Sequence, residues 1–229
     1  MIIKTVADYK TPYIRMIVYG QPGVGKTRFG SSLPKPCLID FDKGFLSARD
    51  LLPPEYKIYV PETWEDILTL ISELRTNREG YESVVIDSFS LAERMIMAHV
   101  LKLSRKDHPT IGDWGMANEK SKRLIEWLCA LNLHICLNCL ELTSKNDLTG
   151  NITCAPLLPG KLSLEAPAFV DEVFHMRSDY DYTKKERKSK FLTSPDGIYI
   201  AKDRSGALDL LEVPDWNTIY GKIIGTNNK

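Results

Sequence analysis

The segment Gly20–Thr27, with the sequence GQPGVGKT, constrains this chain more than any other feature. It directly follows Ile14–Tyr19, a mostly apolar stretch with β-branched members that is typical of a strand. Glycines allow the backbone to wrap closely around a phosphate, and the free amides of a following helix point at the same place. Because every fixed position of G-x-x-x-x-G-K-[ST] is present, the sequence predicts a phosphate-binding loop between a strand and a helix.

The positions of this loop assign individual residues to a nucleoside triphosphate. The predicted nucleotide-binding set is Gly20, Gln21, Pro22, Gly23, Val24, Gly25, Lys26, Thr27 and Arg28. Lys26 would bridge the β- and γ-phosphates, and Thr27 would give its hydroxyl to Mg²⁺. A second metal-binding carboxylate is expected at the end of a neighbouring strand, and Asp87 closes the apolar stretch Ser83–Asp87. ATP and Mg²⁺ are therefore the expected cofactors, with Thr27 and Asp87 at the metal.

Hydrolysis also requires a group that orients or deprotonates water opposite the γ-phosphate. Asp40 and Asp42 stand where the apolar residues 37–39 end. Since side chains alternate along a strand, these two carboxylates share one face and either could point to the site.

Strand-like and helix-like segments alternate along most of the chain. Expected strands are 14–19, 37–41, 57–60, 83–87 and 134–140, and expected helices begin at Lys26, after Thr63, at Ser90 and at Met116. Capping boxes are predicted at Thr63–Asp66 and at Ser90–Glu93. Such alternation favours an α/β fold with a mainly parallel sheet that helices cover on both faces.

The C-terminal third has a different character. We expect a loop or hairpin over 143–160, a strand over 170–176, a turn over 178–190, and a strand pair formed by 191–193 with 197–201. The chain is predicted to be one domain over 1–229, with an N-terminal arm (1–12), a nucleotide-binding core (13–176) and a C-terminal hairpin region (177–229). Because the first strand begins near Tyr13, no additional N-terminal domain is expected.

Composition excludes several classes of protein. Thirty Lys and Arg balance thirty Asp and Glu, so any surface for a polyanion must be local. No signal pattern or membrane-length apolar stretch occurs, which predicts a cytoplasmic protein without a membrane partner. Cys136 and Cys139 would point to opposite faces of one strand, so a shared metal is excluded and structural thiols are expected.

The order of five segments resembles the phage-encoded RecA-like ATPases that are linked to single-strand annealing and recombination. These segments are 20–27, 39–44, 84–88, 156–161 and 201–206. The resemblance implies a RecA-like core, ATP hydrolysis and, for a phage protein, the host cytoplasm. It places Asp42 where such ATPases carry a catalytic glutamate, one methylene longer, and it makes Asn138 or Glu141 the residue that senses the γ-phosphate.

Lys202 and Arg204 are similar to the K-x-R finger of RecA-fold helicases and recombination motors. The resemblance implies that both cations act catalytically on the γ-phosphate of the next subunit, so the chain would self-associate head to tail with a shared ATP site. Residues two apart in a strand share a face and can converge on one anion. A solvated, charged strand end is the alternative.

Single-stranded DNA is the partner that this resemblance implies. It assigns DNA contacts to the loops 104–115 and 143–161, whose candidate residues are Arg105, Lys106, His108, Trp114, Lys145, Asn146 and Lys161. The basic run 184–190 is either a local DNA patch or a solvated hairpin tip.

Two other functions use the same loop. A nucleotide-gated loader or interaction module, acting on a single-strand-binding or replication protein, would bind ATP without significant hydrolysis. A small-molecule or nucleotide kinase would need an arginine-bearing lid, which Arg177 and Arg187 do not obviously form.

Overall fold

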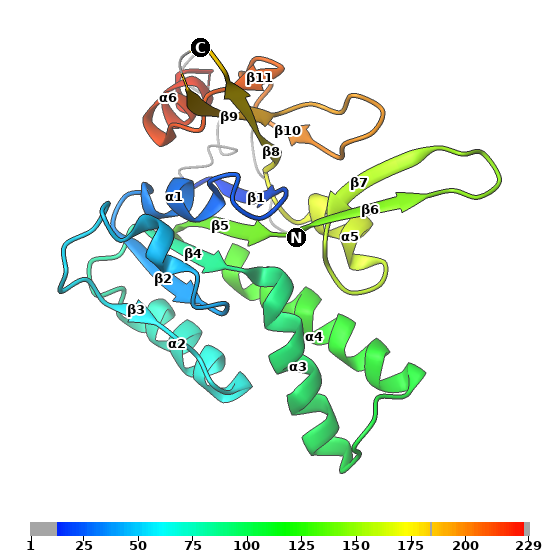
Figure 1. Ribbon diagram of the computed structural model, residues 1–229. Helices are drawn as coiled ribbons and strands as arrows, with labels where there is room; N and C mark the ends of the chain where they lie inside the picture. The colour runs from blue at the N-terminus through cyan, green and yellow to red at the C-terminus, as the bar shows by residue number, and fades with distance from the viewer. Residues whose placement is uncertain (1–12, 184, 227–229) are drawn as a thin grey trace, which may run out of the picture.

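The computed structural model describes residues 13–183 and 185–226, so the expected arm over 1–12 lies outside the described residues. A mixed sheet runs through the molecule in the order β11-β9-β8-β1-β5-β4-β2-β3 (Figure 1). Its parallel part consists of β1 (Arg15–Tyr19), β2 (Pro36–Asp40), β3 (Ile58–Tyr59), β4 (Ser83–Asp87), β5 (His134–Cys139) and β8 (Glu172–Asp181). This confirms the α/β fold with a mainly parallel sheet, and the order β8-β1-β5-β4-β2 is consistent with a RecA-like core.

Helices cover both faces of this sheet. These helices are the short α1 (Lys26–Ser31) and the longer α2 (Trp64–Thr76), α3 (Phe89–Ser104), α4 (Ile111–Cys129) and α6 (Trp216–Thr226). Helices α2, α3 and α4 pack into one apolar cluster, and α1 and α6 pack into the other. The central strands are therefore buried on both sides, which explains their continuous apolar sequences. No helix of the described ranges is both long and apolar enough for a bilayer span.

The cysteines of β5 behave as the strand geometry predicts. Cys136 packs in the α1–α6 cluster, whereas Cys139 packs in the α2–α4 cluster, on the opposite face. Burial raises the pKa of the Cys139 thiol to about 12. Within residues 13–183 and 185–226, no group of three metal-ligating side chains occurs. Both thiols are thus buried, protonated parts of the core.

An antiparallel extension replaces the turn that we expected over 178–190. Strand β8 continues to Asp181 and pairs with β9 (Glu186–Leu192), which pairs in turn with β11 (Leu211–Glu212). Residues 197–201 do not pair with 191–193, because Tyr199 forms a bridge with Cys154 of the strand over residues 152–156. The next residues form β10 (Lys202–Asp203), which pairs with β8. Beyond Met176, β8 and the paired part of β9 up to Lys190 lie outside the core, so they lack the apolar alternation that identifies a strand. The expected boundary at residue 177 falls inside β8.

A shorter hairpin forms from β6 (Glu141–Lys145) and β7 (Ile152–Pro156). Of the loop and the hairpin that we expected over 143–160, the structure therefore contains the hairpin. It projects from the sheet beside the short helix α5 (Leu162–Glu165) (Figure 1).

Two predicted helix starts were wrong. Helix α3 begins at Phe89, and the Ser90 hydroxyl donates to Leu157 O while it accepts from the amide of Leu140. The Ser90 hydroxyl thus connects α3 to the segment that follows β5, and it does not form a capping box. Helix α4 begins at Ile111 behind a capping box of Thr110 and Asp113, which shortens the expected loop 104–115. The capping box of Thr63 and Asp66 is confirmed at the start of α2.

Candidate nucleotide-binding site

The loop between β1 and α1 needs glycine at two positions. At Gly20, a side-chain Cβ would lie 2.2 Å from the carbonyl oxygen of Met176, so only glycine allows β8 to pass this closely. Gly25 caps α1 with a φ of 112°, which lies in the left-handed region. The Ser189 hydroxyl of β9 donates to Val24 O at 2.7 Å. The C-terminal strands therefore support the loop from outside.

Lys26 closes the loop from inside. Its ammonium donates to the carbonyl oxygens of Gly20 and Gln21 at 2.8 and 2.9 Å, and the residue is only 7% exposed. Burial lowers the pKa of Lys26, and the carboxylate of Asp87 opposes this shift. The cation is held in the concavity of the loop, where a phosphate would meet it.

Asp87 and Asn138 meet Thr27 at the carboxyl edge of the sheet. The pKa of Asp87 is raised, mainly by burial and also by the neighbouring Asp42 carboxylate. The hydrogen bond from the Thr27 hydroxyl opposes this shift. The Asn138 amide lies close enough to lower the pKa of Asp87 as well. In the part of the chain that the structure describes, the Asn138 side-chain nitrogen nevertheless has no partner at good hydrogen-bonding geometry, and neither has the buried hydroxyl of Ser88.

These groups fit a magnesium ion. Mg²⁺ prefers hard oxygen ligands and retains several water molecules. Thr27 and Asp87 supply a hydroxyl and a carboxylate side by side, and Asp40 and Asp42 add negative charge nearby. The amide of Asn138 lies behind Asp87 and helps to hold that carboxylate in place.

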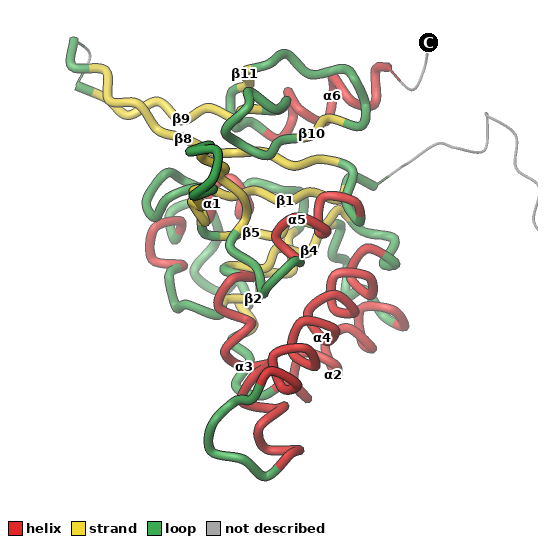
Figure 2. The backbone as a smooth tube through the Cα atoms, turned by 90° about the vertical axis from the view of Figure 1, so that its right-hand side faces the viewer, coloured by secondary structure: helices red, strands yellow, loops and turns green. Residues whose placement is uncertain are grey.

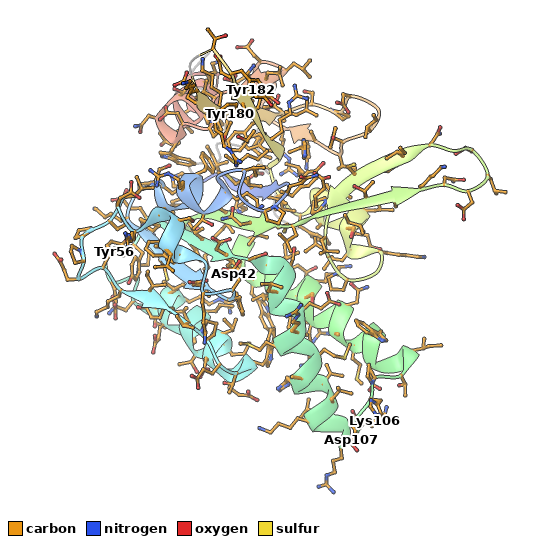
Figure 3. All side chains as sticks on the ribbon, viewed as in Figure 1. Asp42, Tyr56, Lys106, Asp107, Tyr180 and Tyr182 are labelled. Carbon is orange, nitrogen blue, oxygen red and sulfur yellow. The ribbon has the colours of Figure 1, made fainter. Side chains whose placement is uncertain are left out.

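The two acidic candidates after β2 occupy different places. Asp40 is buried, and its Oδ1 accepts from the amides of Asp42 and Gly44. Asp42 lines a cavity of about 280 Å³, together with Pro22, Gly23, Gly25, Lys26, Thr27, Arg28, Gly44, Ser47, Asp87, Ser88 and Leu140. Figure 3 shows Asp42 near the middle of the molecule, above the N-terminal end of α3. Of the two carboxylates, Asp42 is therefore the one that faces the phosphate space.

The two sensor candidates also differ. Asn138 points from β5 toward Asp87. Glu141 Oε2 instead lies within hydrogen-bonding distance of His175 Nε2, at 2.9 Å. The His175 ring stacks on Tyr199 with 3.9 Å between the ring centroids. The polar cluster of Glu141, His175 and Tyr199 joins the base of the β6–β7 hairpin to β8. Sequence reasoning did not identify this cluster.

Lys202 and Arg204 lie at the other edge of the sheet. Lys202 donates to the carbonyl oxygens of Pro167 and Val170, and Arg204 pairs with Asp171 at 2.7 Å. Asp171 also accepts from the amide of Arg15, where β1 begins, whereas the phosphate-binding loop follows the end of β1. The structure therefore does not bring these two cations to the loop of their own chain.

The expected DNA-binding loops are separate from each other. Lys106 and Asp107 mark the tip between α3 and α4 in Figure 3, away from the β6–β7 hairpin (Figures 1 and 2). Lys106 donates to both carboxylate oxygens of Asp113, and Trp114 lies on α4 at 48% exposure. Sequence reasoning missed an exposed aromatic pair, Tyr180 and Tyr182, on the β8–β9 ribbon (Figure 3).

Comparison with known families identifies the domain. The model of the AAA domain family matches residues 13–205, which is most of the chain. The chain belongs to this AAA domain family. Its membership and the loop geometry together support nucleotide binding in this AAA domain.

Similarity to individual proteins is weaker than the similarity to the family. No curated protein matches this AAA domain. One solved structure, described as "Structural and biochemical analysis of a prototypical ATPase from the type III secretion system of pathogenic bacteria", is similar with 14% identity and a TM-score of 0.47. The match covers 72% of this chain and 52% of that chain, so this AAA domain spans about half the length of that ATPase.

Proposed function

We propose that this AAA domain binds Mg·ATP at Gly20–Thr27, hydrolyses it, and acts on single-stranded DNA in phage-type recombination or annealing in the host cytoplasm. One observation carries the ATPase part of the proposal. Lys26, Thr27, Asp42 and Asp87 line one cavity at the carboxyl edge of the sheet, and the buried amide of Asn138 lies behind Asp87. The four lining side chains provide a cation, two metal ligands and a carboxylate that can act on water, which phosphoryl transfer requires.

Each side chain has a distinct task in hydrolysis. Lys26 transfers its hydrogen bonds from the carbonyls of Gly20 and Gln21 to phosphate oxygens. Thr27 and Asp87 hold the magnesium ion, which when bound neutralises charge on the phosphates. Asp42 orients the attacking water and accepts its proton, because its carboxylate opens onto the same cavity. Asn138, buried beside Asp87, senses the terminal phosphate through that carboxylate.

The DNA part of the proposal draws support from the β8–β9 ribbon. Tyr180 and Tyr182 are exposed and pack edge to face with 5.0 Å between ring centroids. Arg187 and Lys190 lie on the paired strand β9. Aromatic rings beside cations bind single strands without sequence preference, through stacking and phosphate contacts. A single-strand-binding or replication protein is the alternative partner for this ribbon.

The ATPase proposal is tested by measuring ATP binding and steady-state turnover for the parent, Lys26→Ala and Asp42→Asn. Removing Lys26 should lower turnover on the order of 10²–10³-fold and weaken ATP binding, because one charged donor to the phosphates is lost. Asp42→Asn should retain ATP binding and lose about 10²–10⁴-fold in turnover, because only proton transfer and water orientation are removed.

Asp147→Asn is the matched control, since this exposed carboxylate lies on the turn of the β6–β7 hairpin. It should turn over ATP at the parental rate. Binding of ATP by the parent without turnover would contradict hydrolysis and favour a nucleotide-gated module. Parental turnover by Asp42→Asn would exclude Asp42 as the residue that acts on water.

A further inference from the structure

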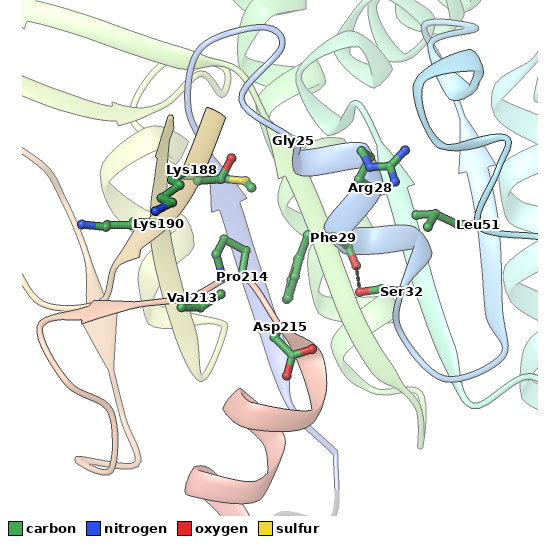
Figure 4. Close-up of a pocket in the computed structure, with 12 residues that line it drawn as sticks. Gly25, Arg28, Phe29, Ser32, Leu51, Lys188, Lys190, Val213, Pro214 and Asp215 are labelled. Carbon is green, nitrogen blue, oxygen red and sulfur yellow. Dashed lines mark hydrogen bonds between the residues drawn. The ribbon is translucent and has the colours of Figure 1, made fainter. Parts of the chain in front are cut away.

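A second and larger cavity adjoins the phosphate space. It has a volume of about 600 Å³ and lies between α1, β9 and the segment that leads into α6 (Figure 4). Gly25 and Arg28 line both this cavity and the smaller one that contains Lys26 and Asp87. The two spaces therefore meet at the N-terminal turn of α1, so one elongated ligand can occupy both.

The walls of the larger cavity suit a flat, mostly apolar group. Phe29 of α1 lies opposite Val213 and Pro214 in Figure 4, and Leu51 and Met176 add further apolar surface. Ligand sites commonly combine such apolar walls with a few polar groups that fix orientation. The smaller space has the charges that a triphosphate needs, whereas the larger one has the walls that a heterocyclic base needs.

Asp215 places a carboxylate at the end of this cavity. Its Oδ1 accepts from the amide and hydroxyl of Thr218 at 2.8 and 2.7 Å, and so caps the start of α6. Among the described residues, Asp215 Oδ2 makes no hydrogen bond and can accept one from a ligand. A carboxylate at this position favours a base that carries an amino group.

We propose that the base of the bound nucleotide lies between Phe29 and the segment Val213–Asp215, with its amino group directed to Asp215. The proposal rests on the proposed nucleotide binding and adds the base-binding element. Residues 213–215 lie outside the part of the chain that the AAA family model covers, which ends at residue 205. The base-binding wall is thus a contribution of the C-terminal segment of this chain.

Calorimetric titration of the full chain with Mg·ATP and with Mg·tripolyphosphate distinguishes binding in the larger cavity from binding in the phosphate space. The parent should bind ATP at least about tenfold more tightly than tripolyphosphate, because only ATP gains the apolar contacts. Val213→Trp fills the larger cavity from a side chain that is 64% exposed. It should reduce ATP affinity to the level of tripolyphosphate and leave tripolyphosphate affinity unchanged.

Leu210→Trp is the matched control, because Leu210 is exposed in the same C-terminal segment and does not line the cavity. It should bind both ligands like the parent. If Val213→Trp also binds ATP like the parent, the base lies elsewhere and the base-binding proposal is overturned while nucleotide binding stands. If the parent binds neither ligand, the proposed nucleotide binding fails and the base site fails with it.

A second variant tests the carboxylate without filling the cavity. Asp215→Asn retains the side-chain oxygen that caps α6 but removes the negative charge. The parent should prefer ATP to ITP, whose base lacks the amino group, by about tenfold, as expected for a hydrogen bond to a charged acceptor. Asp215→Asn should lose most of this preference. An unchanged preference would exclude Asp215 as the partner of the base.

Discussion

At the scale of the residue, Glu172 carries a carboxyl group in an unfavourable place. It is 1% exposed, its Oε2 has no hydrogen-bond partner among residues 13–183 and 185–226, and Asp171 and Asp203 lie beside it. Burial, followed by the charge of Asp203, raises the pKa of Glu172 from 4.5 to about 8. This carboxyl group is therefore protonated in the folded protein at neutral pH, which avoids an unpaired buried charge.

The raised pKa of Glu172 makes stability depend on pH. Its contribution is fully present below about pH 4.5 and is lost as pH rises through about 8, because the folded state holds a proton that the unfolded chain releases. Glu172→Gln cannot titrate. Relative to the parent, its free energy of unfolding should rise by roughly 4 kcal/mol between about pH 5 and about pH 9.

Urea unfolding at these two pH values measures the change. Glu126→Gln provides the control, because Glu126 is exposed on α4. A constant difference between Glu172→Gln and the parent across this range would show that Glu172 does not retain its proton in the fold.

At the scale of the element, the β8–β9 ribbon joins the nucleotide site to the surface. Met176 of β8 lies against Gly20, and Ser189 of β9 donates to Val24 O. Farther along the same two strands, the ribbon leaves the body of the molecule and carries Tyr180 and Tyr182 (Figure 2). A single pair of strands thus contacts the phosphate-binding loop at one end and presents aromatic rings at the other.

Replacing both tyrosines by alanine should weaken binding of single-stranded DNA by about 10–100-fold, because stacking contributes about 1–3 kcal/mol per base. Fluorescence anisotropy with a labelled oligonucleotide measures this loss. Trp114→Ala is the comparison, since Trp114 is the exposed aromatic residue of the other candidate surface on α4. Loss of DNA binding in Trp114→Ala, with parental binding by the tyrosine variant, would assign the DNA to the α3–α4 end instead.

At the scale of the whole molecule, the phosphate-binding loop and the Lys202–Arg204 segment lie at opposite ends of the parallel strands. The loop follows the end of β1, and Arg204 pairs with Asp171 next to the start of β1. If Arg204 acts on ATP, it must reach the loop of a neighbouring chain. A role of Arg204 in hydrolysis would therefore require head-to-tail assembly, which remains a prediction.

Arg204→Ala should therefore bind ATP like the parent and lose at least about 10³-fold in turnover, the range known for arginine fingers. Mixing it with Lys26→Ala should restore part of the activity, because each mixed interface can combine one intact loop with one intact finger. Turnover is measured against protein concentration and subunit ratio. Arg123→Ala, which removes an exposed pair with Glu119, is the control.

Asp171 keeps its contacts with Arg15 when Arg204 is removed, so the fold should persist in Arg204→Ala. Parental turnover by this variant would contradict the shared site.

The sequence predicted those parts that local chemistry specifies. The loop Gly20–Thr27 and the position of Asp87 follow from residue type and from the order of strand, loop and helix. The pairing of residues 177–181 with 186–190 and the helix α6 were missed for a physical reason. This outer part of the ribbon lies outside the core and has no apolar period, and α6 is held largely by tertiary contacts such as the packing of Trp216 on His134.

The position of Lys26 has a consequence for how a ligand arrives. Its ammonium donates to two peptide oxygens of the same turn, at 2.8 and 2.9 Å. A polyphosphate that binds as proposed would take the place of these two carbonyls on a cation that is already in position. Recognition would then exchange one pair of acceptors for another and would not require the ordering of a long segment.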